Sequence, residues 1–265
     1  GKLTIVKDAQ PNDAQDFAFT ATGSGTSGFA LDDDADGTLS NTKTFTFDGN
    51  QLGSKSITET ATSGWTLTSL SCTKTNTGAG STATVDIQAG DDVTCTFTNK
   101  KAAKLTIVKD AQPDSAQDFA FTATGSGTSG FSLDDDADGT LSNTKTFTFD
   151  GNQLGSKSVT ETATSGWSLT DVSCTKTNTG SGSTATVDIQ AGDDVTCTFT
   201  NKQDATVQVV KDAQPNAAQD FAFTTTGLGA GFYLDDDADG TLSNTKNITV
   251  TAGGLGYGSK TITET

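Results

Sequence analysis

Three polar residues lie in segments where hydrophobic and polar residues alternate, on the face that this alternation predicts to be buried. The same three residues recur in a second copy of the sequence. Each shares its face with hydrophobic residues at every second position. A buried amine, carboxyl or amide costs free energy unless such groups satisfy one another. The sequence therefore predicts that each trio meets in the interior; the alternative for the asparagine is a turn position at the end of its strand. The two sets are Lys7, Glu59 and Asn99, and Lys109, Glu161 and Asn201.

A third, more divergent copy keeps Lys211 and Glu264 but holds no counterpart of the asparagine. This copy stops at Thr265, just past the point that matches Thr60 of the first copy. Two explanations stay open, a window cut from a longer array of repeats or a domain completed by strands of another chain. Lys211 and Glu264 are thus predicted to lack an acceptor within this chain.

The four cysteines fall at equivalent positions of the two complete copies, with no CxxC motif and no histidine in the chain. Zinc sites and thiol–imidazole catalysis therefore have little support. Even, regularly placed cysteines favour disulfides and an oxidising compartment. The predicted pairs are Cys72 with Cys95 and Cys174 with Cys197, each within one copy, and free buried thiols are the alternative.

The segment LDDDADGTLSN occurs three times, at Leu31–Asn41, Leu133–Asn143 and Leu234–Asn244. Its alternate aspartates before a glycine reproduce the start of a DxDxDG calcium loop. The position of the bidentate glutamate of an EF-hand is Lys43, and the flanking segments have strand patterns, so an EF-hand is excluded. A looser calcium site or a solvated acidic turn remains, and no other cofactor is expected. The candidate ligands are Asp32, Asp34 and Asp36, Asp134, Asp136 and Asp138, and Asp235, Asp237 and Asp239.

Composition and periodicity indicate an all-β protein around these residues. Hydrophobic residues make up only 32% of the chain, and Thr, Val, Ile and Phe, which suit a pleated half-buried surface, alternate between Gly- and Asn-containing turns. No useful length shows the apolar period of an amphipathic helix. Seven or so strands per copy predict a two-sheet, Ig-like β-sandwich. A slip of parity between Leu67 and Leu70 predicts a β-bulge.

The internal repeat sets the domain organisation. Lys2–Lys100 and Lys104–Lys202 align without a gap and differ only mildly. Because a solenoid unit is much shorter, each copy is predicted to be a domain with its own core. The junctions NKKAAKLT and NKQDATVQ lack a Pro- or Ser-rich linker, which predicts an end-to-end rod. The predicted domains are 1–102, 103–204 and the incomplete 205–265.

The net charge of −17 opposes binding to nucleic acid and to an anionic membrane surface, because both attract basic proteins. No apolar run approaches the length of a membrane span, and no signal peptide is visible. Enzymatic function is the weakest hypothesis, since the chain lacks histidine and any metal cluster or nucleophile constellation that could build a catalytic cleft.

Three short motifs of the repeat resemble the Cna B-type, SpaA-like prealbumin-fold domains of bacterial pilins and surface adhesins. They are LTIVKD at Leu3–Asp8, ITET followed by GW within Ile57–Trp65, and TFTN at Thr96–Asn99. The resemblance covers the whole repeat and implies a prealbumin-like sandwich in each domain.

The resemblance also implies a spontaneous isopeptide bond. Lys7 would be its nucleophile, Asn99 its acceptor and Glu59 its promoter, with Lys109, Asn201 and Glu161 in the same roles in the second copy. Burial lowers a lysine pKa and raises a glutamate pKa, which gives a neutral amine and a protonated acid. Such a bond would be a single-turnover self-modification, so the protein would not be an enzyme. The alternative is an ordinary hydrogen-bonded trio.

The leading functional hypothesis is a structural repeat of an extracellular filament, pilus-like fibre or surface stalk at a bacterial cell surface. Its expected partners are copies of itself or further repeats of the same chain. The alternative is an adhesin or binding module that recognises a host protein, a carbohydrate or another surface ligand. That alternative requires an exposed aromatic patch, for which Phe29, Tyr233 and Tyr257 are the candidates.

Overall fold

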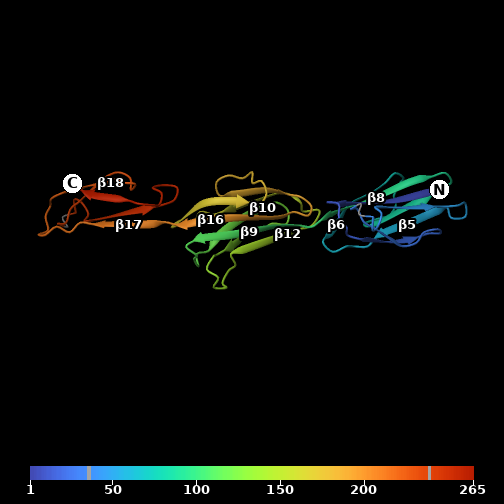
Figure 1. Cartoon of the computed structure of the whole chain (residues 1–265), viewed down its shortest axis with the longest axis horizontal. Helices are drawn as coiled ribbons and strands as arrows, with labels where there is room; N and C mark the ends of the chain where they lie inside the picture. Colours follow the sequence, from blue (N-terminus) through green and yellow to red (C-terminus); the bar gives the residue numbers. More distant parts are fainter. Residues whose placement is uncertain (35–36, 238–239) are drawn as a thin grey trace.

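The computed structural model describes residues 1–34, 37–237 and 240–265, and its regular elements in those ranges are all strands (Figure 1). The all-β prediction is therefore confirmed. No helix long and apolar enough to cross a membrane occurs in the described residues.

Eight strands build the first repeat as two facing four-stranded sheets. One sheet has the order β4-β1-β8-β6 and the other β3-β2-β5-β7. The strands are β1 (Lys2–Gln10), β2 (Phe17–Thr22), β3 (Phe29–Leu31), β4 (Thr42–Thr46), β5 (Gly53–Glu59), β6 (Trp65–Cys72), β7 (Thr82–Ile87) and β8 (Asp92–Lys101).

The second repeat has the same topology, with sheets of order β12-β9-β16-β14 and β11-β10-β13-β15. Its strands are β9 (Ala103–Gln112), β10 (Phe119–Thr124), β11 (Phe131–Leu133), β12 (Thr144–Phe149), β13 (Gly155–Glu161), β14 (Trp167–Cys174), β15 (Thr184–Ile189) and β16 (Asp194–Gln203).

The third repeat pairs β17 with β20 and forms a second sheet of order β19-β18-β21. These elements correspond to the first five strands of a complete repeat. They are β17 (Ala205–Val210), β18 (Phe221–Thr226), β19 (Phe232–Leu234), β20 (Thr245–Val250) and β21 (Thr261–Glu264).

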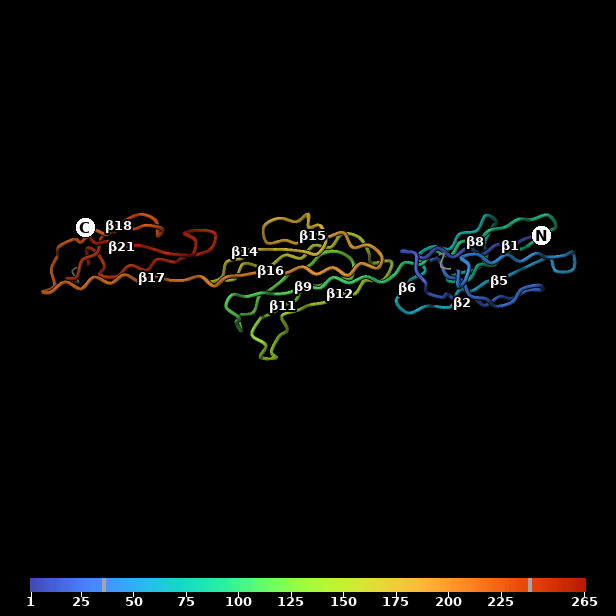
Figure 2. Tube along the Cα trace, in the orientation of Figure 1, coloured from blue at the N-terminus to red at the C-terminus, as the bar shows by residue number. Residues whose placement is uncertain are grey.

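A parallel pair lies at the centre of each complete repeat. The first strand, β1, runs parallel to the last strand, β8, along its whole length, whereas the other pairings of the first repeat are antiparallel. The chain therefore enters each domain at one end and leaves at the other. Because of this geometry the repeats follow one another in a row, as Figures 1 and 2 show.

Each complete repeat has its own core between its two sheets. In the first, Leu3 and Ile5 of β1 meet Phe17 of β2 and Phe97 of β8, all fully buried. The alternation of buried and less buried residues along β1 and β8 follows from the two-residue period of a strand. Burial of each such side chain stabilises the fold by about 1.5–3 kcal/mol.

The predicted bulge is present, since the pairing of β6 with β8 shifts register between Leu67 and Ser69. The short strand β3 was not expected from the sequence. It places Phe29 flat against Phe19, with ring centroids 4.9 Å apart, so the expectation that Phe29 is an exposed aromatic is wrong. A three-residue edge strand is too short to show a period, which explains why it was missed.

The junction between the first two repeats is a single residue, Ala102, whose amide donates a hydrogen bond to the Gly64 carbonyl (2.8 Å). Across the junction the Gly151 amide donates to Thr66 Oγ1 (3.0 Å). A Cβ at Gly151 would lie 2.9 Å from Lys100 Cβ, so only glycine allows this close approach. These contacts explain how the repeats stay in line without a linker.

The second junction is also one residue, Asp204, between β16 and β17. Its amide donates to the Gly166 carbonyl (2.8 Å), and its carboxylate accepts a hydrogen bond from Ser168 Oγ (2.7 Å). Tyr257 of the third repeat donates from its hydroxyl to the Gln203 carbonyl (3.0 Å). The two junctions therefore use the same backbone hydrogen bond and differ in their side-chain contacts.

Candidate functional site

The three polar residues of the first trio come from three strands and both sheets. Lys7 lies on β1, Asn99 on the adjacent β8, and Glu59 at the end of β5 in the facing sheet. In the parallel register Lys7 is opposite Phe97, and Asn99 is two residues further along β8. Strand periodicity therefore points all three side chains into the space between the sheets.

The structure brings this trio into direct contact. Lys7 Nζ donates a hydrogen bond to Asn99 Oδ1 at 2.8 Å and lies 3.8 Å from Glu59 Oε1. It also donates to the backbone carbonyl of Phe97 at 3.1 Å. Lys7, Glu59 and Asn99 are each no more than 3% exposed. The asparagine is thus part of a buried cluster and is not a turn residue.

The second repeat reproduces the arrangement. Lys109 Nζ donates to Asn201 Oδ1 at 2.7 Å, and the distance from Nζ to Glu161 Oε2 is 3.9 Å. Here the Asn201 amide nitrogen also donates to Glu161 Oε1 at 2.6 Å. The glutamate therefore reaches both the amine and the nitrogen that would leave as ammonia.

Burial shifts the protonation equilibria of both ionisable members. Desolvation lowers the pKa of Lys7, and likewise that of Lys109, from 10.5 to about 8. Desolvation also raises the pKa of Glu59 and of Glu161, against the opposing attraction of the lysines. A proton transfer from the ammonium to the carboxylate is therefore far less costly here than in water.

The glutamate carboxyl has few hydrogen-bond partners. Neither carboxyl oxygen of Glu59 accepts a hydrogen bond, and Oε2 of Glu161 accepts none. An unsatisfied buried carboxylate is costly, and protonation removes the charge. A cavity of about 110 Å³ borders Glu59 and Asn99 and is also lined by Trp65. This space is large enough to hold a water molecule or an ammonia molecule.

Aromatic rings form one wall of the site. Lys7 Nζ lies 4.2 Å from the centre of the Phe17 ring, and Trp65 packs edge-on against the same ring. The amine is therefore held over an apolar surface that excludes water.

The third repeat pairs Lys211 and Glu264 directly, with Nζ 3.0 Å from Oε1. Their side chains are 14% and 44% exposed, whereas those of Lys7 and Glu59 are 0% and 2% exposed. The described part of the third repeat contains no counterpart of β8, the strand that covers Lys7 in the first repeat. This pair is an ordinary, partly exposed ion pair.

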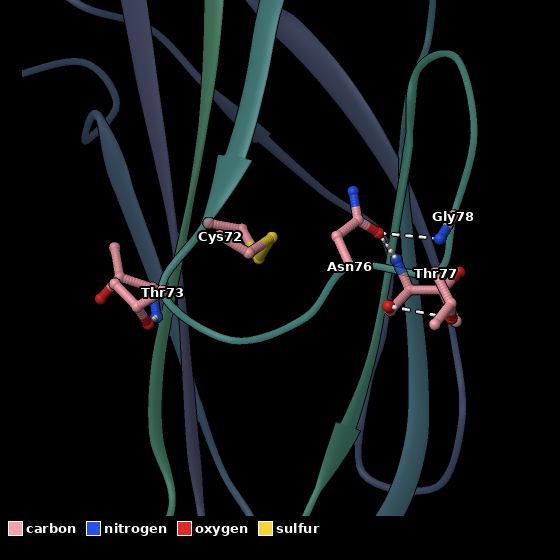
Figure 3. Close-up of a disulfide and its surroundings, with 8 residues drawn as sticks. Cys72, Thr73, Asn76, Thr77 and Gly78 are labelled. Atoms are coloured by element: carbon pink, nitrogen blue, oxygen red, sulfur yellow. Dashed lines mark hydrogen bonds between the residues drawn. A yellow bond between two sulfur atoms is a disulfide. The ribbon is translucent and has the colours of Figure 1, made fainter.

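Both predicted disulfides are present in the structure. Cys72 at the end of β6 is joined to the directly opposite Cys95 of β8, and Cys174 is joined to Cys197 in the same way. Figure 3 shows the first bond beside Asn76, whose side-chain oxygen accepts hydrogen bonds from the amides of Gly78 and Thr84 at 2.8 Å. Asn76 thereby anchors the loop that follows the disulfide.

The acidic loops follow the short strands β3, β11 and β19. Their first aspartates, Asp32, Asp134 and Asp235, are each only 1% exposed. Asp34 and Asp237 lie in the described part of their loops, whereas Asp36 and Asp239 lie outside the described residues. In the second repeat the carboxylates of Asp134, Asp136 and Asp138 converge, with one oxygen from each lying within 4.8 Å of the others.

One pair of buried cations was missed by the sequence analysis. Lys55 and Lys157 are 1% exposed, and each amine lies over a phenylalanine ring, Phe47 or Phe149. Lys55 shares the buried face of β5 with Ile57 and Glu59, so strand alternation could have found it. Neither lysine belongs to a carboxamide trio.

The aromatic residues considered for ligand binding do not behave alike. Tyr233 is 61% exposed, Tyr257 contacts the junction between repeats, and Phe29 packs on the core. A shared aromatic surface of these three residues is therefore not formed.

Among solved structures, the Bacillus anthracis TIE protein aligns with all of this chain at 14% identity and a TM-score of 0.35; the chain spans 45% of its length. The major pilin of Streptococcus pyogenes aligns at 18% identity and a TM-score of 0.25, covering 76% of this chain and 97% of the pilin. Two B repeat units of the collagen binding protein of Staphylococcus aureus align at 12% identity and a TM-score of 0.24, covering 100% and 68%.

Comparison with curated proteins finds no significant match. A family model, in contrast, matches two consecutive stretches, residues 3–101 and 105–203. Together these stretches include all strands of both complete sandwiches except the first residues of β1 and β9. The chain therefore belongs to the SpaA-type family of prealbumin-like fold domains.

Proposed function

We propose that this chain is a structural part of an extracellular filament, pilus-like fibre or surface stalk of a bacterium, with each complete repeat closed by a Lys–Asn isopeptide bond and a disulfide. The observation that carries the proposal is the contact between a buried lysine amine and a buried asparagine amide, at 2.8 Å for Lys7 and 2.7 Å for Lys109. A glutamate lies within 4 Å of each amine.

The proposed reaction is an amide exchange. The neutral Lys7 amine attacks Cγ of Asn99 while the protonated Glu59 donates a hydrogen bond to the amide oxygen. One proton passes from Lys7 Nζ to Asn99 Nδ2 through the glutamate. The new bond joins Nζ to Cγ, the bond from Cγ to Nδ2 breaks, and ammonia leaves. The reaction occurs once in each domain, so it is maturation and not turnover.

The position of the bond supports a mechanical role in resisting tension. Lys7 and Asn99 lie on β1 and β8, the strands through which the chain enters and leaves the domain. A covalent link between these strands would carry tension across the domain without passing it through the strands in between. The disulfide from β8 to β6 adds a second covalent tie within the same sheet.

The row of repeats also supports this role. Short, hydrogen-bonded junctions keep successive domains in line, which suits a shaft better than a flexible tether. The net charge of −17 adds solubility to an exposed protein.

Electron microscopy of the native material tests the filament assignment. We expect fibres of beads stacked end to end, or stalks on the cell surface, each bead being one sandwich. Separate, freely diffusing monomers in material released without proteolysis would contradict it.

A further inference from the structure

We propose that the loop between β11 and β12 binds a calcium ion through the carboxylates of Asp134, Asp136 and Asp138. All three carboxylates of an acidic loop lie within the described residues in the second repeat, so the proposal is made for this loop. The proposed calcium site is independent of the isopeptide bond, since the loop shares none of the trio residues.

The first observation is an unsatisfied oxygen on a buried carboxylate. Asp134 is 1% exposed; its Oδ2 accepts a hydrogen bond from Thr140 Oγ1 at 2.9 Å, while its buried Oδ1 has no hydrogen-bond partner. Asp32 in the first repeat shows the same pattern, with Thr38 Oγ1 donating to Oδ2 at 3.0 Å and Oδ1 unpartnered. A desolvated charge in this state costs free energy unless a cation compensates it.

The second observation is the convergence of two further carboxylates on this group. One oxygen each from Asp134, Asp136 and Asp138 lies within 4.8 Å of the other two. Calcium binds oxygen at 2.3–2.6 Å, so ligands on opposite sides of one ion lie about 5 Å apart. One ion can therefore contact all three groups. Asp138 is exposed, which leaves the outer side open to the waters that complete the coordination.

Asp135, which lies between Asp134 and Asp136, makes a different contact, and this explains why three aspartates follow one another in the sequence. Asp135 Oδ2 accepts a hydrogen bond from the Ala111 amide at 2.8 Å and so ties the loop to the end of β9. Asp33 makes the same bond to Ala9 at 2.9 Å in the first repeat. The loop is thus fixed to the sandwich through Asp135 and is not merely a solvated acidic turn.

The ligand set favours calcium over other ions. Three carboxylates and water are hard oxygen ligands, and the chain contains no histidine. Magnesium requires a small, nearly ideal octahedral shell and gives up its waters reluctantly, whereas calcium accepts irregular sites. With only three charged ligands, we expect the dissociation constant of an extracellular module, about 10⁻⁴–10⁻³ M.

Equilibrium dialysis of the whole chain against radioactive calcium tests the proposal. We expect saturable binding by the wild type, and one ion fewer per chain after Asp134→Asn. The matched control is Asp171→Ser, which removes one charge from the same domain and installs the residue found at the equivalent Ser69; it should bind as many ions as the wild type. No saturable binding, or equal loss in the two variants, would overturn the proposal.

A second variant changes an exposed ligand, because substitution of the buried Asp134 could lower calcium binding by disturbing the fold. Asp138→Ala removes the ligand oxygen from an exposed side chain, so the domain should still fold and should also bind one ion fewer than the wild type. Full binding by this variant would remove Asp138 from the site. Displacement of calcium by an equal concentration of magnesium would refute the selectivity for calcium.

Discussion

At the residue scale, the central feature is a lysine, a glutamate and an asparagine that are costly to bury separately and are buried together. Their convergence could be predicted from strand alternation, because each shares a face with core residues. The details required the structure. The sequence did not reveal that Lys7 contacts the amide more closely than the carboxyl, with distances of 2.8 and 3.8 Å.

The lysine pKa values predict a specific pH dependence in a chain that cannot form the crosslinks. In Glu59→Gln with Glu161→Gln, Lys7 and Lys109 remain free amines. Their folded pKa is about 8 in the uncrosslinked trio beside the glutamate, and removal of the attracting glutamates lowers this pKa further. Between pH 8 and 10.5 the unfolded chain then binds more protons than the folded chain, so the free energy of unfolding rises with pH. The expected rise is about 1 kcal/mol or more for each lysine.

Urea unfolding at pH 8, 9 and 10 measures this slope. The wild-type chain is the control, because a lysine nitrogen in the proposed amide bond would not titrate in either state. We expect the slope from these two lysines only in the variant. The same slope in both chains would mean that Lys7 and Lys109 are free amines in the wild type.

At the element scale, the sequence predicted most strands, the bulge in β6 and both disulfides, because each leaves a local signal. It missed β3, whose three residues are too few to show alternation. It also missed the burial of Lys55, because a charged side chain is expected at the surface even though Lys55 shares a strand face with Ile57. The pairing of β1 with β8 was expected only through the family resemblance, which joins Lys7 to Asn99, because long-range sheet order leaves no periodic signal in the sequence. That pairing is what places Lys7 beside Asn99.

The disulfides belong to the same scale, since each ties two neighbouring strands. We expect reduction to lower the free energy of unfolding by about 3 kcal/mol per bond, as a loop of this length gives in the chain-entropy model. Cys72→Ser with Cys95→Ser should reproduce the loss in the first repeat only. Thermal unfolding followed with and without a reductant measures it, and an unchanged melting temperature would contradict a stabilising role.

At the scale of the whole molecule, the parallel arrangement of the first and last strands allows the sandwiches to be joined end to end. The chain enters and leaves each domain at opposite ends, and one-residue junctions keep the next domain in line with the one before it. The proposed crosslinks lie on this line in both complete repeats. The third repeat shows the contrast: its Lys211–Glu264 pair is partly exposed, and in the described part of this repeat no β8 counterpart covers it.

The intact mass of the whole chain, unfolded and fully reduced, tests the crosslinks most directly. Each isopeptide bond removes one ammonia, so the wild type should weigh about 34 Da less than its sequence requires, about 17 Da for each complete repeat. The variant Glu59→Gln with Glu161→Gln should weigh what its own sequence requires, whereas the control Glu264→Gln should keep the full deficit. A wild-type mass equal to that of the plain sequence would contradict the account.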